Sequence, residues 1–368
     1  MRTNTVTPTT HNHQKTRPTP SNPTYVTRVR RATSFTLLLA LPLLPACAAH
    51  SNSPPNTFSF TLHDRTYNGA IASPPAESQN DFAVLLIGGG LANDLDWTTP
   101  SDYAIKGEPH YDAIRLTEAL TSRGFTVGRW STIHRDDPHA DHWPERATTN
   151  AYPEALELAA AALDAFSETS GIPADRIALL GHSLGATRAV HIVSRGINPP
   201  ALALLAPARL ARTGPVDDDG RAARAEGRAR FDALLNQSLD APLPPDFDGD
   251  GHHAPWEFAA DFAIRQREHD NAMRVNPRDR FGLEWPEDIL LRADIPTLIV
   301  CGGLDHSQSM YGPIIQRRAE QENNESIRVE YLPGLGHTLG AERNGKIGPI
   351  SQIAIDLVAD WLTEILTQ

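Results

Sequence analysis

The stretch RIALLGHSLGATRAVHIVSR, from Arg176 to Arg195, decides the fold. Its opening RIALL is a short apolar run that predicts a buried strand, and residues 186–195 have the apolar spacing of a helix. Between them, GHSLG at 181–185 matches G-x-S-x-G, which predicts a nucleophile elbow when a strand precedes it and a helix follows it. Such a tight turn needs small residues on both sides and lifts the hydroxyl of Ser183 above the sheet. The alternative is a glycine-rich turn without chemistry.

Strands and helices alternate along the rest of the chain. Apolar or alternating segments predict strands at 57–66, 67–71, 82–87, 125–130, 201–205, 297–301 and 327–331. Periodic segments predict helices at 111–123, 153–168 and 350–366. This alternation indicates an α/β fold with a mostly parallel sheet and helices on both faces.

The interval 206–294 breaks the alternation because it contains no clear buried strand. It holds a helix rich in Arg and Ala at 221–235, a Pro/Asp segment at 239–251 and an aromatic-bearing helix at 256–267. So long a connection in a compact domain usually has a structure and function of its own. We expect a cap inserted over the carboxyl edge of the sheet, before the strand that carries the predicted acid.

A nucleophilic serine needs a base to take its proton and an acid to orient that base. Asp305 follows one predicted strand in the phrase CGGLD, and His337 follows the last strand in LPGLGH. Both stand past the carboxyl ends of their strands, the edge where active sites of open α/β sheets lie. His306 is the alternative base. Asp294 is the alternative acid, although it precedes its strand and so belongs to the opposite edge.

Attack on a carbonyl creates an oxyanion, which needs backbone N–H donors. Leu184, directly after the predicted nucleophile, would supply one donor. The glycine run after the strand 82–87 would supply the other, with Gly89 as the first choice and Gly90 as the second. The alternative is a phosphate-binding loop, but neither common phosphate-binding motif is completed here.

Together these motifs resemble the α/β-hydrolase superfamily, in particular its secreted esterases and its dienelactone-hydrolase and serine-aminopeptidase-like branches. The phrases LLIGGGLANDLD, GHSLG, CGGLD and GLGH carry the resemblance, which covers residues 57–366 of a domain expected at 57–368. The order of groups in that family implies Ser183 as nucleophile, Asp305 as orienting acid and His337 as base. The chain departs from the family in having Ile87 where a histidine often precedes the oxyanion glycine.

The first 46 residues predict an export signal. Three arginines precede the apolar run TLLLALPLLPA at 36–46, which is too short to span a bilayer. The residues LPAC at 44–47 resemble the lipobox of bacterial lipoproteins. We therefore expect a lipid on Cys47, a linker over 47–56 and a location at the cell envelope; an ordinary signal peptide is the alternative.

Charge excludes some partners of the mature chain. Residues 1–46 contain six basic and no acidic residues, so their removal leaves 27 Lys and Arg against 45 Asp and Glu, a net charge of −18. Nucleic acid and anionic lipid headgroups would repel such a surface. We expect no nucleic-acid partner, and contact with a membrane through the lipid anchor only.

Part of the insertion matches the EF-hand loop pattern D-x-[DN]-x-[DN]-G-x₅-E. Alternate carboxylates and a closing glutamate supply the oxygens that Ca²⁺ requires, and a backbone carbonyl adds another. The predicted ligands are Asp246, Asp248, Asp250, His252 through its carbonyl, and Glu257. Prolines before the loop rule out a regular entering helix, so it resembles an isolated or dockerin-type loop with a structural role. The alternative is an acidic loop that only keeps the protein soluble.

The phrase HRDDPHADHW at 134–143 has no standard ligand spacing and predicts a solvated loop.

The leading functional hypothesis is hydrolysis of a small-molecule carboxylic ester through an acyl-enzyme, with no cofactor needed for catalysis. Amide or peptide hydrolysis would use the same three residues and the same tetrahedral intermediate. A third hypothesis is a catalytically idle surface protein that keeps the fold for binding. The presence of all three residues argues against it, because the fold has no structural need for them.

Overall fold

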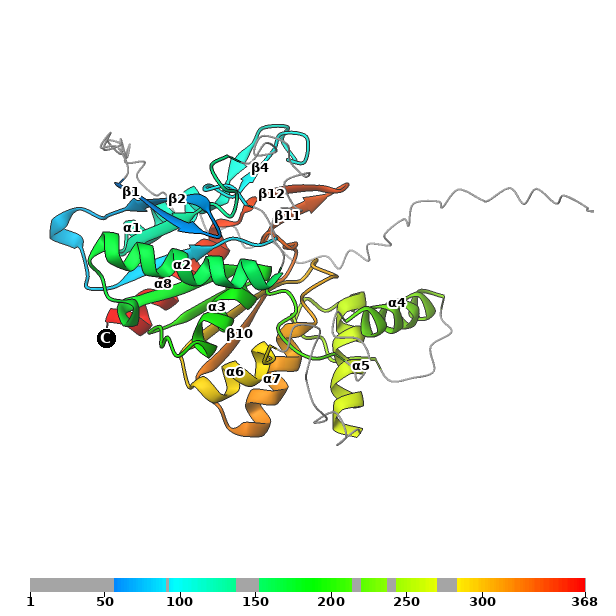
Figure 1. The fold of residues 1–368 in the computed structure, drawn as a ribbon. Coiled ribbons are helices and arrows are strands. Elements are labelled where there is room, and N and C mark those ends of the chain that lie inside the picture. The colour runs from blue at the N-terminus through cyan, green and yellow to red at the C-terminus, as the bar shows by residue number, and fades with distance from the viewer. Residues whose placement is uncertain are drawn as a thin grey trace, which may run out of the picture. The chain divides into compact units, whose positions relative to one another are not determined.

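The computed structural model describes residues 56–90, 93–136, 152–213, 220–236, 243–269 and 283–367 (Figure 1). The predicted signal, Cys47 and the linker up to residue 55 lie outside the described residues, as does most of HRDDPHADHW. Export and lipidation therefore stay predictions. Within the described ranges, no helix has the length and apolar character needed to cross a membrane.

An eight-stranded sheet lies at the centre, in the order β1-β2-β6-β3-β7-β8-β9-β10. The pairs β1–β2 and β2–β6 are antiparallel, and the other neighbours are parallel. The mostly parallel sheet predicted from the alternation is thus confirmed. The strands are β1 (Asn56–Leu62), β2 (Arg65–Ala72), β3 (Ala83–Ile87), β6 (Thr126–Trp130), β7 (Ile177–His182), β8 (Leu202–Leu205), β9 (Thr297–Gly302) and β10 (Ile327–Leu332).

Helices cover both faces of this sheet (Figure 1). Side chains of β3 alternate between two hydrophobic clusters, with Leu85 in one and Leu86 in the other, because successive residues of a strand point to opposite faces. One face carries α1 (Asp112–Thr121) and α8 (Gln352–Thr367). The other carries α2 (Tyr152–Ser170), α3 (Leu184–Ser194), α6 (Pro286–Ala293) and α7 (Tyr311–Glu322).

The first hairpin turns earlier than the sequence pattern predicts. The alternation places a single strand over 57–66, whereas the chain turns at His63 and Asp64, which have φ of 47° and 60°. Arg65 already pairs with Leu62 in the second strand. A two-residue turn with positive φ at both positions matches the twist of the flanking strands, and it leaves the apolar–polar alternation almost undisturbed.

Two further pairs of short strands stand outside the main sheet. They are β4 (Thr98–Thr99) with β5 (His110–Tyr111), and β11 (Gly340–Arg343) with β12 (Lys346–Ile350). The second pair forms a hairpin that follows His337 and projects from the body of the domain (Figure 1).

Within the interval 206–294, which the sequence predicts as a cap, two helices form a pair that we call the cap. Helices α4 (Arg221–Leu235) and α5 (Pro255–His269) pack against each other so closely that a Cβ on Gly227 would lie 2.6 Å from the amide nitrogen of Ala259. Helix α6, in contrast, packs with α3 and α7. The last part of the interval therefore belongs to the helical layer on the sheet.

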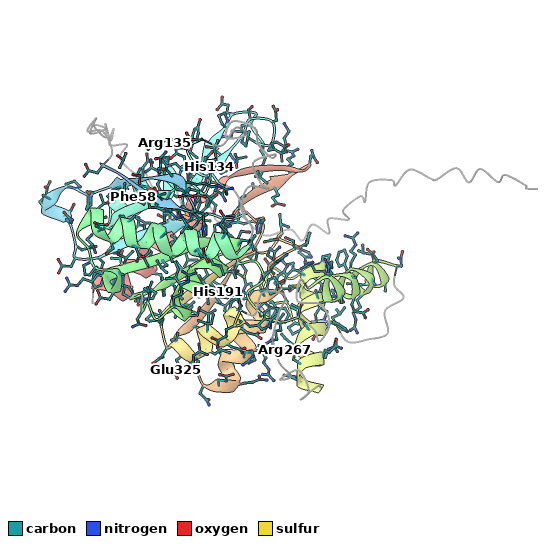
Figure 2. All side chains as sticks on the ribbon, in the orientation of Figure 1. Phe58, His134, Arg135, His191, Arg267 and Glu325 are labelled. Atoms are coloured by element: carbon teal, nitrogen blue, oxygen red, sulfur yellow. The ribbon has the colours of Figure 1, made fainter. Side chains whose placement is uncertain are left out.

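A buried ion network ties the cap to the rest of the domain. Glu287 of α6 is fully buried, and its carboxylate accepts hydrogen bonds from Arg212 at 2.8 Å and Arg267 at 2.9 Å. Arg267, labelled in Figure 2, comes from α5, and Arg212 comes from the segment after β8. The two guanidinium groups compensate the buried negative charge, and the carboxylate in turn fixes three segments relative to one another.

We expect Glu287→Gln to lower the free energy of unfolding by about 3 kcal/mol, because it removes the counter-charge of the largely buried Arg267 and leaves Arg212 with Asp288 alone. Urea denaturation followed by circular dichroism measures the change. The matched control is Glu284→Gln, which breaks an exposed ion pair with Arg292 and should cost less than about 1 kcal/mol. Equal losses in the two variants would contradict the assigned role.

Candidate active site

The turn between β7 and α3 holds Ser183 in a strained backbone conformation. Its φ of 54° and ψ of −121° lie in a region that residues with a Cβ rarely adopt. The N–H of Ser183 donates to the carbonyl of Leu205 at 2.9 Å, and its carbonyl accepts from the N–H of Ala208 at 3.1 Å. Such strain persists only where the surroundings fix it, and it is concentrated at functional sites.

Glycines on both sides of Ser183 allow this turn. A Cβ on Gly181 would lie 2.4 Å from the carbonyl oxygen of Gly185, and a Cβ on Gly185 would lie 2.0 Å from that of Ile87. The elbow thus packs backbone against backbone, both within itself and on the end of β3. This contact is the physical reason for the G-x-S-x-G spacing.

The structure brings Ser183, His337 and Asp305 into one hydrogen-bonded chain. Nδ1 of His337 lies 2.7 Å from Oδ2 of Asp305, and its Nε2 lies 2.9 Å from Oγ of Ser183. An ionised carboxylate only accepts, so Nδ1 carries the proton and Nε2 is free to accept from the serine hydroxyl. Ser183 follows β7, Asp305 follows β9 and His337 follows β10, all at the same edge of the sheet.

The surroundings of Asp305 favour its ionised form. The side chain is buried, which alone would raise its pKa, but hydrogen bonds from His337 and Ser307 outweigh burial and lower the pKa. Oδ1 accepts from the hydroxyl of Ser307 at 2.8 Å and from the N–H groups of Ser307 and Gln308, both at 3.1 Å. One oxygen is therefore anchored while the other binds the histidine.

The same interaction raises the pKa of His337. Burial disfavours the imidazolium, but the hydrogen bond and the charge of Asp305 outweigh it and bring the pKa above its usual value. A histidine that accepts from a serine hydroxyl and whose protonated form a carboxylate stabilises has the properties of a general base.

The two alternatives considered for these positions lie elsewhere. Asp294 ends α6 and precedes β9, which puts it at the opposite edge of the sheet from Ser183. His306 is exposed, and its side chain makes no hydrogen bond with another described residue. The hydrogen bonds to Ser183 and Asp305 are made by His337.

Two side chains that the sequence analysis did not predict hold the backbone of His337. Its N–H donates to Oε1 of Glu342 in β11 at 2.9 Å, and its carbonyl accepts from Nε2 of His182 at 2.9 Å. Burial, with the nearby His337, lowers the pKa of His182 to about 4, so this ring is neutral and carries its proton on Nε2. The position of His182 next to Ser183 was a signal for such a role, whereas nothing in the sequence placed Glu342 here.

The predicted oxyanion donors lie at the elbow. Gly89 is buried so close to Ser183 that a Cβ on it would lie 2.7 Å from the Cβ of the serine. Leu184 begins α3, where the first N–H groups have no partner within the helix. In the part of the chain that the structure describes, no hydrogen bond uses the N–H of Gly89, Gly90 or Leu184. Their role as oxyanion donors stays a prediction.

The acidic loop before α5 assembles part of the predicted calcium site. Carboxylate oxygens of Asp246, Asp248 and Asp250 lie within 4.8 Å of one another. Glu257 is not part of that group: its carboxylate is buried and accepts from the N–H groups of Phe247 and Ala254, both at 2.7 Å. Burial raises the pKa of Glu257 to about 7 and that of Asp248 to about 6. His252 is exposed, and its N–H donates to Asp250. The oxygen donors suit Ca²⁺ in kind, and its binding stays a prediction.

This acidic loop lies against the turn that leads to Asp305. The indole N–H of Trp256, the second residue of α5, donates to the carbonyl of Gly303 at 2.9 Å. The same indole stacks on Tyr331 of β10, with ring centroids 6.0 Å apart. Trp256 is buried in this packing and fastens the cap to the core. Phe258 is also buried, but its ring packs on Phe231 of α4.

Adding about 1 mM Ca²⁺, roughly tenfold above the Kd of 10⁻⁴ M found in extracellular modules, should raise the free energy of unfolding by about 1.4 kcal/mol and hence the Tm. Asp248→Ala combined with Glu257→Gln should abolish the increase, and Asp261→Asn, in α5 outside the loop, should keep it. Identical melting of the wild type in Ca²⁺ and in EGTA would overturn the prediction.

Comparison with known proteins finds similarity to solved structures only. No family sequence profile and no curated protein sequence matches it. A proline iminopeptidase from Mycobacterium smegmatis has a TM-score of 0.47 at 16% identity, over 85% of this chain and 99% of its own. A carboxylesterase from Bacillus subtilis has a TM-score of 0.43 at 14% identity, over 86% and 92% of the two chains. The strand order, the elbow after β7 and the hydrogen-bonded residues that follow β9 and β10 are those of the α/β-hydrolase fold.

Proposed function

We propose that the protein is a serine hydrolase that cleaves carboxylic esters through an acyl-enzyme on Ser183. The observation that carries the proposal is the continuous hydrogen-bonded chain from Asp305 through His337 to Ser183, with contacts of 2.7 and 2.9 Å. The strained elbow supports it, because it presents the serine hydroxyl at the sheet edge where the two other groups lie.

In the first half of the reaction, Nε2 of His337 takes the proton of Ser183 as Oγ attacks the ester carbonyl carbon. Asp305 stabilises the imidazolium that forms. The carbonyl oxygen becomes an oxyanion, which the N–H groups of Gly89 and Leu184 would receive. The intermediate then expels the alcohol, which leaves with the proton from His337, and the acyl group remains on Ser183.

In the second half, water replaces the alcohol as the attacking group. His337 removes a proton from the water as its oxygen attacks the acyl carbon, and a second oxyanion forms at the same amides. Collapse returns the proton to Oγ of Ser183 and releases the carboxylic acid. The neutral His182 and the carboxylate of Glu342 keep the backbone of His337 in place through both halves.

We expect the wild type to hydrolyse p-nitrophenyl esters and Ser183→Ala to lower kcat by about a millionfold, because members of such a triad act as one unit. Ser194→Ala is the matched control, since this serine lies on the same helix and its hydroxyl donates, among the described residues, to the carbonyl of His191 alone. Initial rates on esters and on aminoacyl anilides measure the effect.

Three outcomes of that panel would contradict the proposal in different ways. Turnover of anilides alone would show that the protein is an amidase or peptidase and not an esterase. Undiminished turnover by Ser183→Ala would show that Ser183 is not the nucleophile. No turnover of either class by the wild type would favour a binding protein that keeps the fold without the chemistry.

A further inference from the structure

We propose that Arg188 is a positioning residue that fixes the orientation of the oxyanion loop, residues 88–90. Arg188 lies in α3, one helical turn after the elbow, and its side chain is completely buried. It would act through the loop, without touching the substrate. The inference rests on the proposed function, because it concerns how that reaction's oxyanion is stabilised.

The guanidinium of Arg188 binds the loop at two carbonyl groups. Nη1 donates to the carbonyl of Gly88 at 2.8 Å, and Nη2 donates to the carbonyl of Gly90. Burying a guanidinium is costly unless its donors find acceptors. Here two donors are used on the loop that places Gly89 against Ser183. A charged donor also makes each of these hydrogen bonds stronger than a neutral one.

The hydrogen bond from Arg188 to the carbonyl of Gly88 also sets the direction in which the N–H of Gly89 points. In a planar trans peptide, the C=O of one residue and the N–H of the next point in opposite directions. The carbonyl of Gly88 faces α3, where it would lie 2.6 Å from a Cβ on Gly185. Arg188 therefore directs the N–H of Gly89 away from α3, and no described residue accepts from it.

A loop of three consecutive glycines needs such an external constraint. Glycine adopts many backbone conformations at little cost, so the peptide between Gly88 and Gly89 is free to rotate unless something holds it. The flipped peptide would present a carbonyl oxygen, which repels the developing oxyanion. Ile87 cannot restrain the loop from the preceding position, because its apolar side chain is buried in the sheet.

The test uses a fluorophosphonate, whose reaction does not depend on the identity of the natural ester. Oγ of Ser183 forms a bond to phosphorus, the P–F bond breaks, fluoride leaves with the electron pair, and His337 takes the serine proton. Charge builds up on the phosphoryl oxygen in the transition state, so the second-order labelling rate reports oxyanion stabilisation.

We expect Arg188→Met to label about 100-fold more slowly than the wild type, the size of effect seen when one oxyanion donor is lost. Arg188→Lys should be about tenfold slower, since its single ammonium cannot span both carbonyls in the planar geometry of a guanidinium. The matched control is Arg267→Met, which removes another largely buried arginine and should stay within about twofold of the wild type. With an ester, the Arg188 variants should lose kcat while KM changes by less than about threefold.

Circular dichroism and melting establish that the variants are folded. Equal labelling of the wild type and folded Arg188→Met would overturn the proposal. If Arg188→Met does not fold, Arg188→Lys decides, and a labelling rate within twofold of the wild type overturns the proposal. A wild type that is labelled at Ser183 but hydrolyses no ester would reject the esterase alone, and Arg188 would still be judged by the labelling rates. A wild type that is never labelled would reject both proposals.

Discussion

The strained backbone of Ser183 is the constraint on which the site depends. A φ of 54° at a residue with a Cβ is unfavourable, and it is held by hydrogen bonds to Leu205 and Ala208 across the neighbouring strand. These bonds have a fixed geometry because β7 and β8 are buried inside a sheet with helices on both faces. The close contact of Gly185 with the end of β3 then sets the distance between the serine and the oxyanion loop.

The remaining groups reach Ser183 from separate parts of the chain, and each has its own support. Asp305 is anchored through Oδ1 by the turn that follows it, while His337 is held at both its N–H and its carbonyl. The cap contacts the same region, since Trp256 donates to Gly303, two residues before Asp305. Trp256 therefore links the cap to the turn before the acid, whereas Arg267 links the cap to Glu287 in the helical layer on the sheet.

Much of the fold and three members of the site could be predicted because their signals are local. Buried strands are continuous apolar runs, and Ser183, Asp305 and His337 each follow such a run within a short, recognisable phrase. Helix α6 was harder to recognise, because it is short and carries Glu287 and Asp288, which are stabilised by arginines distant in sequence. Ion pairs between residues that are far apart in the sequence leave no periodic pattern in it.

The supporting residues of the site were missed for the same reason. Arg188 appears in the sequence as a polar residue on an amphipathic helix, and only the packing of α3 under the glycine loop reveals its two carbonyl partners. Glu342 belongs to a short polar hairpin whose strands have no apolar alternation. The turn at His63 and Asp64 was missed for a different reason. The apolar–polar alternation runs through this two-residue turn almost undisturbed, so it did not show where the first strand ends.

The central claim is that Ser183 carries the acyl group during ester hydrolysis. Rapid acid quenching of the wild type during turnover of a p-nitrophenyl ester, followed by peptide mass spectrometry, tests it directly. The account predicts a mass increase equal to the acyl group on the peptide containing Ser183, and no such increase in Ser183→Ala. An acyl group on another residue, or ester turnover without any acylated peptide, would contradict it.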